Sequence, residues 1–429
     1  MHSQNERRHA LGRVVAGALL AGIAGCGGGQ PTTYNAPNSV VIADFTGNGY
    51  NDLAVVSALV NTLNNSYESP GVLAVIPQNT SSPGTFAAST HYSSEGNPSS
   101  LAAGDLTGSG VIDLVVSNYN KGSVSVLLQD GKGHFQSAVN FATGGNPNDV
   151  QIADIDGDGR ADLIIADGSV NAYVQVMLQD PANPGHFLPP TNLAGATIPA
   201  ASSGTTVATY TVAVGDLNGD GKPDLAVTSF DSQGDHGNVR IYLQDPSHPG
   251  KFLAPVDVSS PGEVRRVRIA DVNGDGKNDL LVGNEGPGLI DTAVFAGVMV
   301  FINTTAAGAT TPTFAAPITY SDASYSPPLE IAIGPLTDAT YPDIVMCSSV
   351  PQGMGSVSVF LHKPGEPGVF VSPPAAAYSG LGNTVSCAIG DLNHDGILDI
   401  GTADSTGAAV MLQSKTAPGT FSPPTLAGS

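Results

Sequence analysis

The sequence predicts an all-β fold built from one repeated unit, and three observations support this prediction. Apolar residues alternate with a period of two, as in Leu225–Ser229 and Val239–Leu243, which is the spacing of strands. The chain has 53 Gly and 32 Pro but only 12% charged residues, which is typical of short strands joined by tight turns. An acidic nine-residue segment recurs seven times, at intervals of 49 to 64 residues.

Two marks define the repeat and its length. A turn that ends in Phe follows each acidic segment, and seven units over residues 39–429 average about 56 residues each, which suits a four-stranded propeller blade. We therefore predict a seven-bladed β-propeller of four-stranded antiparallel blades. The acidic segments begin at Asp44, Asp105, Asp154, Asp216, Asp271, Pro335 and Asp391, and the turns end at Phe86, Phe135, Phe187, Phe252, Phe314, Phe370 and Phe421.

The fourth unit illustrates the order of strands. Its first strand, Thr211–Gly215, enters the acidic segment, and its second, Leu225–Ser229, leaves it. A variable loop leads to the third strand, and Phe252-Leu-Ala-Pro-Val opens the fourth. The chain starts on a first-type strand at Val40 and ends on a fourth-type strand after Thr420. Because the repeat starts on a first strand and ends on a fourth strand, we predict that the C-terminal strand completes the first blade and closes the ring.

Four acidic segments have the ligand spacing of a calcium loop, and a fifth is a softer version. Side chains at positions 1, 3, 5 and 9 and the carbonyl at position 7 supply oxygens, while Gly at position 6 permits the sharp turn. We expect four to five Ca²⁺ sites. The predicted ligands are Asp154, Asp156, Asp158, Arg160 and Asp162; Asp216, Asn218, Asp220, Lys222 and Asp224; Asp271, Asn273, Asp275, Lys277 and Asp279; Asp391, Asn393, Asp395, Ile397 and Asp399; and, in the softer loop, Asp44, Thr46, Asn48 and Asp52.

An alternative is that Asp and Asn in these segments only make Asx turns that fold each hairpin. The Asp105 segment keeps only its outer carboxylates, and the Pro335 segment has lost the ligand set. For the four strong loops we favour calcium, because three or four carboxylates within one turn would repel one another without a cation.

These residues resemble the FG-GAP (VCBS-type) repeats of the integrin α-subunit propeller and of many bacterial secreted proteins. Phe252-Leu-Ala-Pro255 and Phe314-Ala-Ala-Pro317 are looser forms of the family's signatures, and the Asp-x-Asn-x-Asp-Gly-x-x-Asp loops match it better. The resemblance covers nearly all of the chain after the N-terminal segment. It implies the propeller fold and says little about function, because one fold serves many functions.

The N-terminus predicts a lipoprotein. Arg7, Arg8 and Arg13 precede an apolar run that is too short to span a bilayer. The run ends in Ile23-Ala24-Gly25-Cys26, which resembles a bacterial lipobox. The resemblance implies a signal peptide over residues 1–25 and lipidation of Cys26, followed by a flexible tether over 26–38. The repeats place the propeller over residues 39–429. The lipobox resemblance also implies an extracytoplasmic protein anchored to the outer membrane or cell surface, which contacts the membrane through its lipid only.

Two further cysteines, Cys347 and Cys387, lie in the sixth and seventh units. Outside the cytoplasm they could form a disulfide between neighbouring blades, or they could remain separately buried thiols. Both alternatives are compatible with the sequence.

The composition argues against several functions. A net charge of −22 argues against a nucleic-acid partner. The sequence contains no His-Glu-x-x-His motif and no Gly-x-Ser-x-Gly elbow before a helix, so we assign no catalytic residue and lean against an enzyme. Arg265, Arg266 and Arg268 form a basic cluster after the N-terminal segment, for which local pairing with carboxylates is favoured over an anionic ligand.

We predict that the loops opposite the acidic segments bind a protein or a glycan at the cell envelope. Alternatives are a lectin-like propeller, which the lack of Trp weakens, and a glycan-active lyase or glycosidase on the same scaffold. The loops of this face carry aromatic residues that could form a contact surface, although ordinary loop packing is the alternative for each. These aromatic residues are Tyr67, Tyr92, Tyr119, Phe230, Tyr320 and Tyr325.

Overall fold

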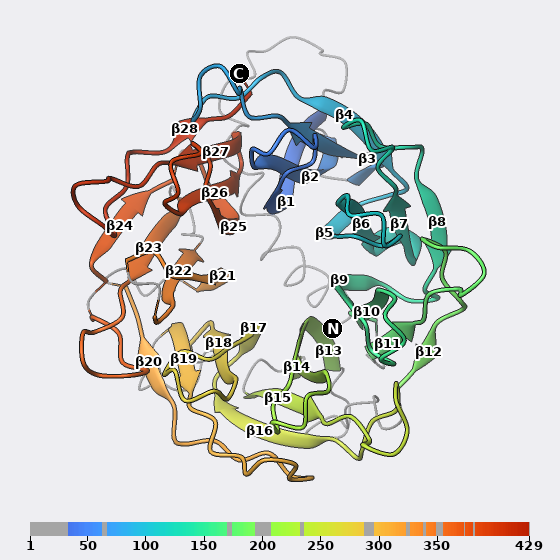
Figure 1. Cartoon of the computed structure of the whole chain (residues 1–429), viewed down its shortest axis with the longest axis vertical. Helices are drawn as coiled ribbons and strands as arrows, with labels where there is room; N and C mark the ends of the chain where they lie inside the picture. Colours follow the sequence, from blue (N-terminus) through green and yellow to red (C-terminus); the bar gives the residue numbers. More distant parts are fainter. Residues whose placement is uncertain are drawn as a thin grey trace.

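The computed structural model is a closed ring of seven four-stranded antiparallel sheets (Figure 1). This confirms the predicted seven-bladed β-propeller. The structure describes residues 33–61, 67–169, 174–193, 207–231, 236–286, 296–322, 327–337, 340–348, 355–372, 374–380 and 382–428.

Each blade consists of four strands that are consecutive in the chain. The first strand of each blade lies nearest the centre of the ring and the fourth lies at the rim (Figure 1). The blades are β1 (Thr33–Ala43), β2 (Asp52–Asn61), β3 (Tyr67–Ile76) and β4 (Thr90–Ser94); β5 (Pro98–Gly104), β6 (Asp113–Asn118), β7 (Ser123–Leu127) and β8 (Val139–Ala142); β9 (Pro147–Ala153), β10 (Asp162–Asp167), β11 (Val174–Met177) and β12 (Thr191–Asn192); β13 (Val207–Gly215), β14 (Asp224–Asp231), β15 (His236–Tyr242) and β16 (Val256–Pro261); β17 (Val264–Ala270), β18 (Asp279–Asn284), β19 (Gly297–Phe301) and β20 (Ile318–Tyr320); β21 (Pro328–Gly334), β22 (Asp343–Ser348), β23 (Ser356–Phe360) and β24 (Ala376–Ser379); and β25 (Thr384–Gly390), β26 (Asp399–Asp404), β27 (Gly407–Met411) and β28 (Thr425–Leu426).

The hydrophobic core is divided among the interfaces between blades. One cluster of buried apolar side chains lies at each of the seven interfaces. This is because, in each blade, neighbouring sheets cover both faces of the second strand. Leu163 and Ile165 of β10, for example, pack against β6 and β7 of the preceding blade, whereas Ile164 of the same strand faces the following blade. Alternate residues therefore serve two different interfaces.

The predicted mode of ring closure is wrong. The C-terminal strand β28 pairs with β27 in the seventh blade, and the first blade has its own fourth strand, β4, paired with β3. The ring closes through side chains instead: Leu53 and Val55 of β2 pack with Leu392 and Val410 of the seventh blade. Among the described strands, none is exchanged between blades, because the first unit supplies four strands by itself.

The structure also locates the start of the first sheet. Strand β1 begins at Thr33, so the ordered sheet starts earlier than residue 39 and includes part of the segment assigned to the tether. The signal peptide and Cys26 lie outside the described residues. Among the described residues, the structure contains no helix with the length and apolar character needed to cross a membrane.

A disulfide joins Cys347 of β22 to Cys387 of β25, with 6.2 Å between their Cα atoms. It links the inner parts of the sixth and seventh blades. Both cysteines are buried within the same apolar cluster at that interface.

Candidate metal centre and binding face

All seven acidic segments have the same length: eight residues separate the first strand from the second in every blade. In six of them the first Asp holds the loop by accepting backbone amides. In the third loop, Asp154 accepts the N–H groups of Gly157 and Gly159, each at 2.8 Å. The Asx-turn interpretation therefore accounts for the first position, independently of any cation. The other five are Asp44, Asp105, Asp216, Asp271 and Asp391.

The ninth position joins the loop to the third strand. Asp162 is buried, and its two carboxylate oxygens accept the backbone N–H groups of Ile155 at 2.9 Å and of Gln179 at 2.8 Å. The same bridge occurs in all seven blades, including the sixth, where the ligand set is lost. The other bridging carboxylates are Asp52, Asp113, Asp224, Asp279, Asp343 and Asp399.

The third loop brings predicted ligands together. Candidate ligand oxygens of Asp154, Asp156 and Asp162 all lie within 4.8 Å of one another. Burial, together with the neighbouring Asp158, raises the pKa of Asp156. Each ionised carboxylate oxygen that accepts one amide keeps a second lone pair, so these residues fit a hard divalent cation.

Burial also raises the pKa of the ninth Asp in the four strong loops to about 6. For Asp162, hydrogen bonds from Gln179 and Ile155 oppose this increase, and the charges of Asp156 and Asp158 add to it. A bound cation would offset both the cost of burying these carboxylates and the repulsion from neighbouring Asp, and would lower their pKa values. The four residues are Asp162, Asp224, Asp279 and Asp399.

Positions 5 and 7 are tied to each other in the four strong loops. The carboxylate at position 5 accepts the N–H of position 7, for example from Arg160 to Asp158 at 2.9 Å. Asp158 also forms an ion pair with the Arg160 guanidinium at 2.5 Å. The corresponding donors in the other loops are Lys222, Lys277 and Ile397, which pair with Asp220, Asp275 and Asp395.

Position 3 differs among the loops. Asn218 and Asn273 direct their amide nitrogens to the position-5 carboxylates, at 3.4 and 3.2 Å, and their amide oxygens accept the N–H of position 5. Asn393 likewise accepts the N–H of Asp395 at 3.1 Å. In the softer loop, the hydroxyl of Thr46 donates to Asp52 at 3.0 Å, while Asn48 accepts the N–H of Tyr50.

Each acidic loop also packs closely against a turn of the next blade. A Cβ on Gly250, in the turn between strands three and four of the fourth blade, would lie only 3.0 Å from Cβ of Asp156 in the third. The same contact closes the ring, since a Cβ on Gly84 of the first blade would lie 3.3 Å from Cβ of Asn393 in the seventh. The acidic loops therefore lie at the joints between blades.

Sequence reasoning missed the amide side chains that complete these joints. The side-chain amide of Gln179 donates to the carbonyl of Leu106 in the preceding blade at 2.8 Å, and Gln244 donates to Ile155 at 2.9 Å. A repeated sequence feature could have revealed these residues, because a Gln, Asn or His forms a β-bridge with each of the seven turn phenylalanines. These partners are Gln78, Gln129, Gln179, Gln244, Asn303, His362 and Gln413.

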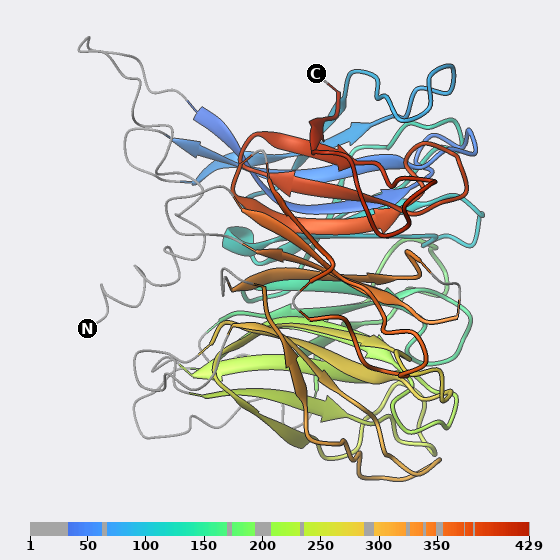
Figure 2. The same ribbon diagram turned by 90° about the vertical axis from the view of Figure 1, so that its left-hand side faces the viewer.

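The opposite face carries loops of unequal length. Figure 2 shows the ring from the side, with the strands running from one face towards the other. By the bounds of the strands, two residues separate β26 from β27, twelve (285–296) separate β18 from β19, and fourteen (193–206) separate β12 from β13. These connections differ from one another in length and composition, whereas the acidic loops all have the same length. Loops that vary on a rigid scaffold are where proteins commonly place binding residues.

Two of the aromatic residues assigned to this face belong to the packing. The hydroxyls of Tyr92 and Tyr320 accept the backbone N–H groups of Phe135 and Phe370, at 3.3 and 3.2 Å, in the next blade. Tyr119 lies in a short 3₁₀ helix, η2 (Tyr119–Lys121), on the loop face. The side chains of Tyr67, Phe230 and Tyr325 are outside the described part of the chain.

The basic cluster is paired, as favoured from the sequence. Arg265 forms an ion pair with Glu285 and lies over the ring of Tyr210, with 4.9 Å from its guanidinium carbon to the centroid. Arg266 and Arg268 both pair with Glu330.

Comparison with known proteins agrees with this architecture. Residues 105–165, 154–227 and 216–282 match the FG-GAP-like repeat. No curated protein matches the chain.

Solved structures include similar folds. A putative 6-phosphogluconolactonase from Bacteroides uniformis covers 88% of this chain and 97% of its own, with a TM-score of 0.54 and 13% identity. A lectin from Agrocybe aegerita that recognises non-reducing terminal N-acetylglucosamine covers 88% of this chain and 87% of its own, with a TM-score of 0.44 and 16% identity. At such identities the first likeness shows the fold alone. Three matched repeats over residues 105–282, within a ring of seven four-stranded blades, support an FG-GAP-repeat β-propeller.

Proposed function

We propose that this chain is a lipid-anchored, calcium-stabilised β-propeller that acts as a non-catalytic binding module for a protein or glycan at the cell envelope. The observation that carries the proposal is the contrast between its two faces. One face has seven loops of a single length, each fastened to the next blade, and the other has connections of two to fourteen residues. A uniform face suits a structural role, and a variable face suits recognition.

Calcium would stabilise the uniform face. The residues that would hold it are the predicted ligands of the four strong loops and of the Asp44 loop. Bound Ca²⁺ would supply a divalent charge that offsets the gathered carboxylates, and would stiffen loops that lie at the joints between blades. Extracellular modules of this kind bind calcium with a Kd of about 10⁻⁴–10⁻³ M, so envelope concentrations would suffice.

The lipid anchor rests on Ile23-Ala24-Gly25-Cys26. Gly27, where a sorting signal would place Asp, favours the outer membrane by resemblance. Cells that express the wild type and Cys26→Ala should be labelled with an alkyne fatty acid and fractionated. Loss of both label and membrane association in the variant supports the anchor, and a wild type without label overturns it.

The binding role is tested with the calcium-loaded full chain in detergent, on a glycan array and in a pull-down from envelope extracts. Any glycan that binds is then assayed for turnover. A variant in which Gly-Ser-Gly replaces residues 287–295 shortens the longest strand 2–3 connection, and blade seven, with its two-residue connection, indicates that the fold tolerates this. Lys132→Ala, on a turn of the acidic-loop face, is the matched control.

We expect one class of ligand to be captured by the wild type and by the control, and to be lost or weakened in the loop variant. Capture that is unaffected by the loop variant but lost in Lys132→Ala would overturn the assignment of the binding face. Cleavage of a bound glycan would overturn the non-catalytic role.

A further inference from the structure

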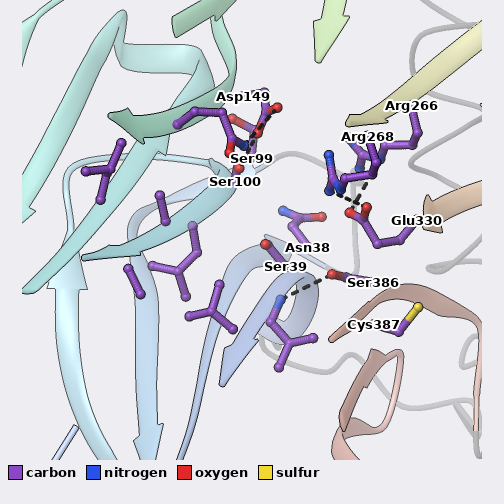
Figure 3. Close-up of a pocket in the computed structure, with 17 residues that line it drawn as sticks. Asn38, Ser39, Ser99, Ser100, Asp149, Arg266, Arg268, Glu330, Ser386 and Cys387 are labelled. Carbon is purple, nitrogen blue, oxygen red and sulfur yellow. Dashed lines mark hydrogen bonds and ion pairs between the residues drawn. The ribbon is translucent and has the colours of Figure 1, made fainter. Parts of the chain in front are cut away.

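A polar cavity of about 270 Å³ lies at the centre of the ring, among the innermost strands (Figure 3). Its lining follows the repeat. The residue five positions before each acidic segment points to the centre in six blades, and we call these residues and their equivalent in the fourth blade the channel ring. The channel ring is Ser39, Ser100, Asp149, Thr211, Arg266, Glu330 and Ser386, of which all but Thr211 line the cavity.

The polar character of the channel ring is a local departure from the apolar pattern of the strands. In the first, second, fifth, sixth and seventh blades, the pairing of the first strand shifts by one residue immediately before this position. Bulges of this kind turn a side chain to a new direction and are frequent beside functional sites. The innermost strands therefore present six polar side chains at one level of the channel.

Positive charge exceeds negative charge on one side of the cavity. Arg266 and Arg268 alternate along β17 and thus lie on the same face, and both pair with Glu330 of β21 (Figure 3). Arg266 is held through Nε, which donates to the carbonyl of Leu329 and lies 3.5 Å from the Glu330 carboxylate. Within the described residues, no hydrogen bond engages its two terminal nitrogens.

The second carboxylate of the cavity does not balance this charge. Asp149 lies across the cavity from the arginines, beside Ser100 (Figure 3). It accepts the Ser100 hydroxyl at 2.7 Å and the backbone N–H groups of Val150 and Val212 at 3.0 and 3.2 Å. On their side of the cavity, the two guanidinium groups therefore share one carboxylate, that of Glu330.

We propose that this central cavity binds a small sugar acid, whose carboxylate lies against Arg266 and Arg268. Guanidinium groups recognise carboxylates through paired hydrogen bonds, and the surrounding hydroxyl and amide side chains of Ser39, Ser386 and Asn38 offer partners for sugar hydroxyls. The cavity is smaller than the about 300–1,000 Å³ typical of drug-sized ligands, which restricts the ligand to about one monosaccharide. Because the site lies within the channel, its test is independent of the test of ligand binding at the loop face.

The test is calorimetric titration of the calcium-loaded full chain with D-glucuronate, with D-glucose and inorganic phosphate as comparison ligands. Arg268→Gln removes one guanidinium, and Lys132→Gln removes an exposed cation outside the cavity as the matched control. Glu330→Gln removes the carboxylate that competes with the ligand, so it should tighten binding. Thermal melts establish that each variant is folded.

We expect the wild type and the control to bind glucuronate alike, Arg268→Gln to bind at least tenfold more weakly, and Glu330→Gln at least threefold more tightly. Glucose should bind at least tenfold more weakly than glucuronate. The proposal is overturned if neither the wild type nor Glu330→Gln binds glucuronate, or if phosphate binds as tightly as glucuronate does. If Arg268→Gln fails to fold, the affinity of Glu330→Gln for glucuronate decides: tighter binding than in the wild type supports the proposal, and equal or weaker binding overturns it.

Discussion

His362 donates its backbone N–H to the carboxylate of Asp343 at 2.6 Å, in the one blade whose acidic segment has lost the calcium ligands. The other oxygen of Asp343 accepts the N–H of Thr337 at 2.9 Å. The ninth carboxylate thus joins the loop to the third strand where no cation is expected. This separates a structural role from a metal-binding role within one repeated position.

Asp343→Ala should destabilise the protein by about 2–6 kcal/mol, because two backbone N–H groups lose their acceptor at about 1–3 kcal/mol each. The loss should be equal with and without calcium. Asp343→Asn, which keeps one acceptor oxygen, should lose less. Chemical denaturation in millimolar calcium and in chelator measures both variants, and a calcium-dependent difference for Asp343→Ala would contradict the structural role.

Asp156→Ala should remove calcium binding at the third loop while leaving the calcium-free fold intact. Asp154 and Asp162 still hold the loop backbone, and removal of Asp156 relieves repulsion from Asp158. Calorimetry should count one calcium fewer, and the gain in melting temperature on adding calcium should shrink. Ser109→Ala, at position 5 of the carboxylate-poor second loop, is the control and should change neither quantity.

The calcium-free protein should become more stable as the pH falls from 7 to 5. The four ninth-position carboxyls have a folded pKa of about 6 against an unfolded value near 3.8, so the folded state binds more protons in this interval. Stability is therefore highest at the acidic end and is lost as the pH rises through about 6. With saturating calcium, protons compete with the cation, so the stabilisation by calcium should shrink over the same acidification. Melts of dialysed protein at both pH values test this, and a lower melting temperature at pH 5 without calcium would contradict it.

Reduction of the Cys347–Cys387 disulfide should lower stability by about 3–4 kcal/mol, the loop-closure value for a sequence separation of 40 residues. The double variant Cys347→Ala with Cys387→Ala should unfold like the reduced wild type, and should no longer respond to reductant. Equal melting temperatures for oxidised and reduced wild type would show that the bridge contributes nothing.

The sequence predicted the features that every unit repeats, and missed those that belong to one unit or to the joints. The acidic segments and the turn phenylalanines fixed seven four-stranded blades because each mark recurs once per blade. The first blade's fourth strand, β4, escaped notice because it lies at the rim, where Thr90, His91 and Ser93 are not buried and leave no apolar alternation. The channel ring escaped notice because its members, from Ser39 to Glu330, differ in chemistry from blade to blade, and only the structure places them around one cavity.

Removing residues 425–429 should have a small effect, because no strand of the first blade pairs with the C-terminal strand, and only the packing of Ala427 and Gly428 against the first blade is lost. Strand β28 has two residues, both exposed, and pairs only with β27. The truncated chain should lose less than about 2 kcal/mol, a loss in the usual range for a single destabilising change. Leu53→Ala, at the buried joint between the first and seventh blades, is the contrast and should cost about 2–5 kcal/mol. Urea unfolding of both variants decides between the two modes of closure: a ring closed by strand exchange would fail on truncation, whereas a ring closed by side-chain packing is more sensitive to Leu53.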